Sequence, residues 1–248
     1  MSGGETELRV LPVPGLPEIE AGMGLGELIA SRGEPRDGDV LVVSQKVVSK
    51  AEGRVRRLSS VSPGAEARRL GAALGKDPAM IELVLQESRE VLRAERGVMI
   101  VETHQGFVCA NAGIDSSNLP DDGTVSLLPE DPDACARKLR AEIAPTIGVV
   151  ISDSFGRAWR LGQVEVAIGC AGLVPLDDWR GRHDAHGREL EATQIAIADQ
   201  VAAAADLVRG KDSRLPAAII RGLARYVSAE DGSGAAALRR ARADDLFR

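Results

Sequence analysis

Short apolar runs, most of them four to six residues long and closed by glycine, proline or polar residues, are the clearest indication of the fold in this sequence. Runs of this length indicate buried β-strands, because amphipathic helices need about ten residues or more. Strands are therefore expected at residues 8–13, 40–43, 98–101, 107–110, 148–151, 164–176 and 216–221. The third and fourth of these flank a polar turn and predict a hairpin.

Helical spacing of Ala and Leu fills much of the sequence between these strands. Helices are expected over residues 24–31, 63–96, 131–143 and 189–209. A break is expected near Asp77-Pro78 in the second helix. Asp131 and Pro132 suit the cap and first turn of the third, and Gly210 suits the end of the fourth, which would be the longest. Residues 44–54 fit either a helix or a loop.

The order of these elements predicts the fold class. Strands and helices alternate without a regular βαβ rhythm, so an α+β fold with mixed β-sheets and flanking helices is expected rather than a doubly wound sheet. With no internal repeat and no obvious linker, residues 1–248 are treated as a single unit. The tail over residues 228–248 is rich in Gly, Ala and Arg and is expected to be peripheral.

Composition excludes several classes of protein. Aromatic residues make up only 2% of the chain, so the core must be built from Leu, Val, Ile and Ala. The net charge of −6 and the lack of a basic block argue against a nucleic-acid partner. Three widely spaced cysteines indicate reduced, buried thiols, and no signal peptide or membrane-spanning run is present, so a cytoplasmic protein is expected.

Two aspartates stand where apolar runs give way to glycine-containing turns: Asp115 follows residues 107–110, and Asp153 follows residues 148–151. If the two run ends meet, these carboxylates repel by roughly 4 kcal/mol at about 4 Å and an effective dielectric near 20. A bound cation would remove that cost, and carboxylates with neighbouring Ser and Asn oxygens suit Mg²⁺ or Mn²⁺. The alternative is that both are ordinary turn-forming residues.

Cationic side chains lie near the same strand ends. Lys46, Lys50 and Arg54 follow the run 40–43 and could clamp phosphate oxygens, or could form a solvated basic face. Arg157 and Arg160 follow Asp153 and suit a polyanion, or a structural network with aspartate. No standard phosphate-binding loop is present. His183 and His186 lack a third ligand at a spacing suited to zinc.

Several segments, taken in order, resemble one known family over nearly the whole chain. They are residues 11–17, 38–43, 48–54, 111–118, 128–133, 152–157, 167–169, 187–191 and 221–223. Together they resemble the F420-0:γ-glutamyl ligase family. The resemblance implies a two-lobed mixed α/β fold whose intertwined lobes have no assignable boundary, and an interlocked homodimer. It also implies GTP, L-glutamate and coenzyme F420-0 as substrates, with an acyl-phosphate intermediate.

The resemblance also implies a set of site residues. Asp115 and Asp153, with Ser154 beside them, would bind Mg²⁺ or Mn²⁺, and Asp115, Asp153 and Arg157 would form the catalytic set. A K⁺ requirement is left open. The implied nucleotide site consists of Gly15, Leu16, Pro17, Glu18, Gln45, Lys46, Lys50, Asn118, Gly210 and Lys211.

The chain departs from the family pattern at two places. Some members have Gly-Glu where this chain has Gly210-Lys211-Asp212, so either Asp212 substitutes for that acid or one metal is bound differently. Lys46 stands where some members have a hydroxyl. Two other functions stay open: a non-catalytic lobe that holds a deazaflavin for a nitroreductase-like partner, and an amide ligase with a different acceptor.

Overall fold

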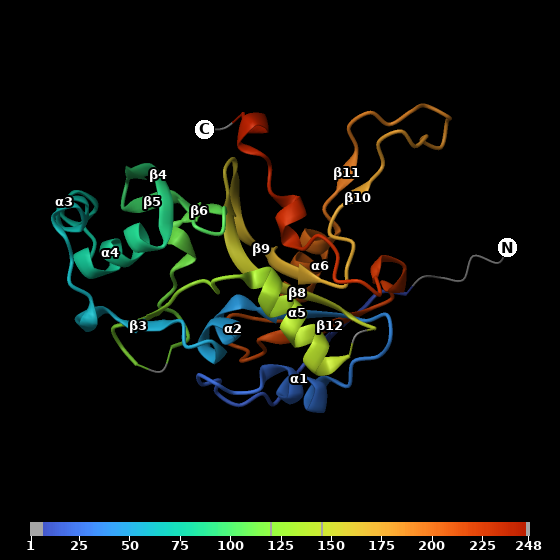
Figure 1. Ribbon diagram of the computed structural model, residues 1–248, viewed down its shortest axis with the longest axis horizontal. Helices are drawn as coiled ribbons and strands as arrows, with labels where there is room; N and C mark the ends of the chain where they lie inside the picture. The colour runs from blue at the N-terminus through green and yellow to red at the C-terminus, as the bar shows by residue number, and fades with distance from the viewer. Residues whose placement is uncertain (1–6, 120, 145, 247–248) are drawn as a thin grey trace.

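A five-stranded mixed sheet forms the centre of the computed structural model, which describes residues 7–119, 121–144 and 146–246 (Figure 1). The strand order is β1-β12-β2-β8-β9. The β2 and β8 strands are parallel, and the other neighbours are antiparallel. The strands are β1 (Arg9–Pro12), β2 (Val40–Ser44), β8 (Gly148–Arg157), β9 (Arg160–Ala171) and β12 (Ala217–Arg221). The predicted α+β class with mixed sheets is confirmed.

Both faces of this sheet are buried. Leu41 and Val43 of β2 join a core cluster that includes residues of α1 (Leu25–Gly33) and α5 (Pro132–Ile143). Val40 and Val42 join a second cluster, which includes residues of α6 (Ile197–Asp206). Successive side chains of a strand point to opposite faces, so a strand covered on both sides must be apolar throughout. This explains why residues 40–43 are all Val or Leu.

A smaller three-stranded antiparallel sheet lies at one end of the molecule, beside α3 and α4 (Figure 1). Its order is β4-β5-β6, and β3 and β7 form a separate two-stranded ladder. These elements are α3 (Ala65–Leu74), α4 (Pro78–Gln86), β4 (Ser88–Glu95), β5 (Val98–Thr103), β6 (Val108–Ala110), β3 (Val55–Arg57) and β7 (Thr124–Ser126). The hairpin predicted around residues 103–106 is confirmed.

The helix expected over residues 63–96 is wrong at its C-terminal end. The break is where the sequence places it, with the Asp77 side chain capping α4 by accepting from the Ala79 N–H. Beyond Gln86, however, the chain forms β4, which pairs with β5. Glu, Leu, Ala and Arg favour helices locally, but pairing across the turn at Gly97 overrides this preference.

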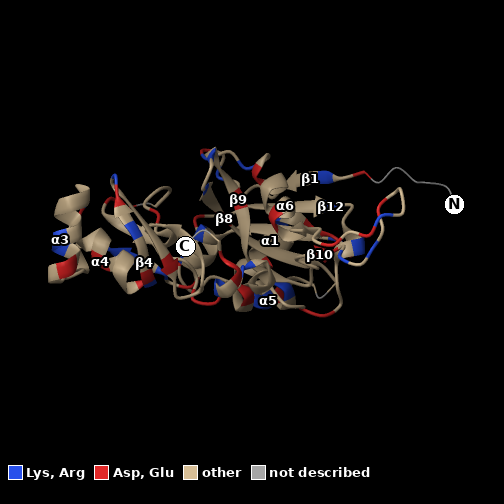
Figure 2. Ribbon diagram, turned by 90° about the horizontal axis from the view of Figure 1, so that it is seen from above, with Lys and Arg blue, Asp and Glu red and all other residues tan. Residues whose placement is uncertain are grey.

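The helix expected over residues 189–209 is also shorter than predicted. It begins at Ile197 and ends at Asp206, so Gly210 is not its cap. The preceding residues form β11 (Gln194–Ile195), which pairs with β10 (Asp177–Asp178) at the base of a protruding arm (Figure 1). Both signs of charge lie along this arm in Figure 2. Antiparallel pairing within the arm replaces the helix that Ala and Glu favour locally.

The predictions for residues 44–54 and for the start of α5 agree with the structure. Residues 44–54, left open between helix and loop, begin with the helix α2 (Gln45–Ala51). The Asp131 side chain caps α5 by accepting from the Ala134 N–H, as predicted. Short 3₁₀ turns are found at Leu58–Ser60, Asn111–Gly113, Ala224–Tyr226, Ala235–Leu238 and Arg242–Asp244. No helix in the described ranges is long and apolar enough to cross a membrane.

The C-terminal segment, expected to be peripheral, makes specific contacts over its described part, residues 228–246. Ala235 is only 1% exposed and belongs to the α6 core cluster. Asp133 of α5 accepts from the Ala235 N–H at 2.7 Å. Arg242 reaches the smaller sheet, where it pairs with Glu90 at 2.8 Å. The segment therefore runs from the central sheet to the smaller sheet.

Gly169 shows how closely α5 packs on β9. A Cβ atom placed there would lie 2.2 Å from the Pro132 carbonyl oxygen. We expect Gly169→Ala to lower the free energy of unfolding by about 3 kcal/mol, because a helix backbone must move to make room. Urea denaturation measures this loss. Gly156→Ala is the control, since nothing lies within 4 Å of its added Cβ. Equal stability of the two variants would contradict the packing argument.

Candidate functional site

Polar side chains from five segments meet beside the junction of β2 and α2. The parallel register pairs Ser44, the last residue of β2, with Ser152 of β8. The first turn of α2 therefore begins next to Asp153. Lys46 and Lys50 are four residues apart and so lie on one face of α2. The Lys46 ammonium donates to Asp115 Oδ2 at 2.6 Å, while Lys50 pairs with Glu18.

Asp115 combines a turn role with an ion pair. Its Oδ1 atom accepts from the Ser117 N–H at 2.8 Å, which is the ordinary turn geometry that the sequence left open. Its Oδ2 atom faces Lys46. Burial raises the pKa of this carboxyl, but hydrogen bonds from Lys46 and Ser117 outweigh burial and hold the pKa below its usual value. Asp115 is therefore a stable carboxylate.

Asp153 has the opposite environment. It lies inside β8, because this strand continues to Arg157 rather than ending at residue 151 as the sequence suggested. Burial, followed by repulsion from Glu165 and Asp115, raises the pKa of Asp153 to about 7, although the Ser154 N–H acts against the shift. The two predicted aspartates are thus close enough to repel each other.

A second group of polar residues extends from Ser154. Its hydroxyl donates to Glu165 Oε1 at 2.5 Å and accepts from the Lys211 ammonium at 2.6 Å. Arg209 donates to Glu165 Oε2 at 3.3 Å. Glu165 and Arg209 were missed by the sequence reasoning. The signals were a single acid inside an apolar strand, Val164-Glu165-Val166, and an arginine directly before Gly210.

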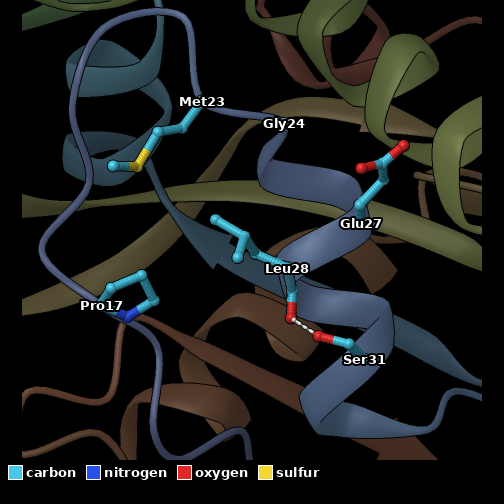
Figure 3. Close-up of a pocket in the computed structure, with 6 residues that line it drawn as sticks. All are labelled: Pro17, Met23, Gly24, Glu27, Leu28 and Ser31. Atoms are coloured by element: carbon cyan, nitrogen blue, oxygen red, sulfur yellow. Dashed lines mark hydrogen bonds between the residues drawn. The ribbon is translucent and has the colours of Figure 1, made fainter.

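The loop connecting β1 to α1 brings most of the remaining predicted residues near this cluster. Gly15 adopts a positive φ of 74°, which turns the chain, and Leu16 packs against the α1–α5 core. Pro17 lines an open hollow of about 540 Å³ beside α1, whose other lining residues are Met23, Gly24, Glu27, Leu28 and Ser31 (Figure 3). The next residue along the chain, Glu18, pairs with Lys50.

Asn118 and Gly210 lie on the loops that border the cluster. The Asn118 backbone carbonyl accepts from Lys50 at 3.0 Å, and its side-chain amide donates to the Lys211 carbonyl at 3.4 Å. Gly210 directly precedes Lys211, and an added Cβ there would meet Asp212. These contacts tie the loop after α6 to the loop that carries Asp115.

Two predicted side chains have hydrogen-bond partners outside the cluster. Gln45 is 1% exposed, and its side-chain oxygen accepts from Ser49 within α2. Arg157 is exposed near the far end of β8 and donates to the Leu161 carbonyl at 2.6 Å. It stands four positions after Asp153 along the strand, which corresponds to roughly 13 Å. Its side chain would have to turn back along the strand to reach the carboxylates.

Asp115, Asp153 and Ser154 carry oxygen atoms of the kind that small hard cations prefer as ligands. Across the described residues there is no group of three or more His, Cys, Asp or Glu placed to hold a metal ion. Two carboxylates and a hydroxyl are nonetheless the kind of partial set that Mg²⁺ occupies, with its other positions left for water or phosphate. The raised pKa of Asp153 supports this fit, since a cation would stabilise the carboxylate that burial and repulsion disfavour.

Comparison with known proteins gives a consistent result. The family described as F420-0:Gamma-glutamyl ligase matches residues 15–222. A protein named coenzyme F420:L-glutamate ligase, from Methanothermobacter thermautotrophicus, is 43% identical over 251 residues, covering 97% of this chain and 99% of its own. Its namesake from Archaeoglobus fulgidus is 46% identical over 221 residues, covering 87% of this chain and 88% of its own. This chain therefore belongs to the F420-0:γ-glutamyl ligase family.

Proposed function

We propose that this chain is a GTP-dependent ligase that joins L-glutamate to coenzyme F420-0 through a γ-linked amide and releases GDP and phosphate. The names of its relatives support coenzyme F420 and L-glutamate as substrates. The single observation that carries the proposal is the cluster of Asp115 and Asp153 with three lysines, Lys46, Lys50 and Lys211. Such a cluster can hold both a divalent cation and the phosphates that accompany it.

The chemistry requires an activated carboxylate. An oxygen of the F420-0 carboxylate attacks the γ-phosphorus of GTP, the bond to the β,γ-bridging oxygen breaks, and GDP leaves. The amino group of glutamate then attacks the carbonyl carbon of the acyl phosphate, loses a proton, and expels phosphate. Phosphoryl transfer depends on alignment and charge neutralisation more than on covalent help from the protein.

Each part of the cluster has a role in this scheme. Asp115, Asp153 and Ser154 would hold Mg²⁺ or Mn²⁺, which supplies neutralisation of phosphate charge when bound. Lys46 and Lys50 lie one helical turn apart and would contact phosphate oxygens, exchanging their present partners Asp115 and Glu18 for the nucleotide. Gly15 to Glu18, Asn118 and the Gly210-Lys211 loop would border the nucleotide.

Mass spectrometry tests the function directly. Coenzyme F420-0 incubated with the protein, GTP, glutamate and Mn²⁺ should gain one discrete mass step for each glutamate added. Parallel reactions with ATP, or without K⁺, test the nucleotide and the monovalent ion. Binding of F420-0 without any GTP consumption would instead support the non-catalytic deazaflavin-binding lobe, and mass steps with another acceptor only would support a different amide ligase.

Lys46→Gln is expected to raise the KM for GTP by about 10-fold to 100-fold, because a charge-assisted hydrogen bond to phosphate contributes about 1.5–3 kcal/mol. Steady-state kinetics with varied GTP measures the change. Lys138→Gln is the matched control, since its side chain is 74% exposed on α5 and pairs only loosely with Glu142 at 3.9 Å. An unchanged KM in the Lys46 variant would remove this lysine from the nucleotide site.

The proposal includes a two-lobed, interlocked homodimer in the cytoplasm. Trp159 and Leu161 near the β8–β9 turn are 75% and 97% exposed, which suits a surface covered by a second copy. All three cysteines are free and buried, which suits a reducing compartment. Light scattering coupled to gel filtration measures the assembly; a monomeric mass at micromolar concentration would overturn this part.

A further inference from the structure

The further inference concerns the ion pair between Lys50 of α2 and Glu18 of the loop that connects β1 to α1. Lys50 is only 7% exposed, and its ammonium donates to the Glu18 carboxylate and, at 3.0 Å, to the Asn118 carbonyl. Neither side chain of this pair has another charged partner in the described part of the chain. A buried ammonium is costly without a balancing charge, so Glu18 is the counter-ion of Lys50.

The two members of the pair differ in how far they are enclosed. The side chain of Glu18 is 59% exposed, whereas that of Lys50 is 9% exposed. The loop that carries Glu18 is fixed, because Ile19 is buried in the α1–α5 core and the Gly22 N–H donates to the Ala51 carbonyl of α2 at 2.9 Å. Rotamer changes of exposed side chains are fast. The Glu18 carboxylate can therefore leave Lys50 by side-chain rotation, without movement of the loop.

The other lysine of α2 has a more firmly held partner. Lys46 pairs with Asp115, and Asp115 also accepts from the Ser117 N–H at 2.8 Å and from the Ser117 hydroxyl at 2.9 Å. Among the described residues, the Glu18 carboxylate accepts a hydrogen bond only from Lys50. Of the two carboxylates that face the α2 lysines, Glu18 is therefore the one that an incoming anion can replace at lower cost.

We propose that Glu18 is a built-in competitor of the nucleotide: it occupies the position on Lys50 that a phosphate oxygen takes, and it must be displaced before the nucleotide binds. A carboxylate and a phosphate compete for the same ammonium and repel each other when both are near it. This inference rests on the function proposed above. It deepens that function, because it gives Glu18 an effect on affinity opposite to that of a residue that binds the nucleotide.

A double-mutant cycle tests the inference with GDP as the probe. Isothermal titration calorimetry measures the Kd of the full chain for GDP in the presence of EDTA, so that neither turnover nor a divalent cation contributes. We expect Glu18→Gln to lower this Kd by about 3-fold to 10-fold, and Lys50→Gln to raise it by about 10-fold. In the Lys50→Gln background, Glu18→Gln should change the Kd by less than about 2-fold, because the competition is for Lys50.

Controls separate this competition from a general loss of negative charge. Glu20→Gln removes an exposed carboxylate two positions further along the same loop and should leave the Kd for GDP unchanged. Thermal unfolding of Glu18→Gln should show a midpoint lower by about 2–4 °C, because Lys50 loses its counter-ion. If Glu18→Gln does not fold, Glu18→Asp replaces it: the shorter side chain holds Lys50 less well, so GDP binding should tighten to a smaller extent.

Three results would overturn the inference while leaving the ligase function in place. They are weaker GDP binding by Glu18→Gln, an unchanged Kd in that variant, and an equal gain in affinity from Glu18→Gln in the Lys50→Gln background. The first would make Glu18 a residue that binds the nucleotide. A wild-type protein that binds no GDP would overturn the nucleotide site together with this inference, and mass spectrometry would then decide separately whether glutamate is added.

Discussion

Asp153→Asn is expected to reduce glutamate ligation by about 10² to 10³-fold and, at the same time, to stabilise the metal-free protein at pH 8. The activity should fall because the proposed cation site would lose one of its two carboxylates. The stability rises because the carboxylate is partly buried and is repelled by Glu165 and Asp115, which raises its pKa to about 7. Asparagine keeps the shape and removes the charge.

The stabilisation should depend on pH in a defined direction. Since the pKa of Asp153 is raised in the folded state, the folded protein binds a proton more tightly than the unfolded chain. Wild-type stability from this group is therefore present below about pH 4 and is lost as the pH rises toward 7. Asp153 keeps part of its surface in solvent, so we expect about 1–2 kcal/mol at pH 8 rather than the full value of the shift. The gain should shrink toward pH 5.

Asp115→Asn is the matched comparison. It should reduce ligation to a similar extent, but it should lower stability at pH 8, because the ionised carboxyl holds Lys46 and the pKa of Asp115 is lowered. Urea denaturation at pH 5 and pH 8, together with mass spectrometry of the glutamylated product, measures both properties. Wild-type turnover in both variants would contradict the proposed metal site. A loss of stability in Asp153→Asn would show that neighbouring groups stabilise the Asp153 carboxylate in its charged form.

The largest loss of stability is expected for Arg140→Met, at about 3–5 kcal/mol. Arg140 of α5 has a side chain only 5% exposed and pairs with Asp231 at 2.7 Å. It also donates to the carbonyls of Ile147 at 2.9 Å and Ser228 at 2.6 Å. Methionine fills similar volume but leaves Asp231 and these carbonyls without their donor. The variant therefore releases the C-terminal segment from the central sheet.

Two further variants sharpen this test. Arg140→Lys keeps the charge but not the planar fork that reaches several acceptors at once, so it should recover only a minor part of the loss. Arg137→Met removes a 43%-exposed arginine of the same helix, whose contact with Asp131 is 3.8 Å long, and should change stability by less than about 0.5 kcal/mol. Equal urea midpoints for the Arg140 and Arg137 methionine variants would show that the Arg140 contacts do not contribute to the free energy of unfolding.

The elements that the sequence predicted well are those whose signal is local. The run 40–43 is apolar at every position because both of its faces are buried, and the Asp131-Pro132 start of α5 is set by its own cap. The elements that failed depend on distant partners. Residues 88–95 have helix-forming side chains but pair with β5. Residues 194–195 pair with residues 177–178, which lie sixteen or more positions earlier in the chain.

The same division applies to the site. Asp115, Asp153 and Lys46 were predicted because each follows an apolar run, and the parallel pairing of β2 with β8 brings them together. Glu165 and Arg209 were not predicted. Glu165 contacts Ser154 only because the register of β8 and β9 places the two residues opposite each other. Arg209 contacts Ser152 and Glu165 only because the segment after α6 lies against these two strands.

The core strands, the capped helices, and the carboxylates and lysines at their edges could be predicted, because they follow from burial and hydrogen bonding between near neighbours in the chain. Which charges neutralise one another depends on long-range folding. That choice separates Asp115, whose hydrogen bonds favour its charge, from Asp153, whose surroundings oppose it. The physical reason is that the energy of a buried charge depends on the distance and orientation of groups brought from elsewhere in the chain.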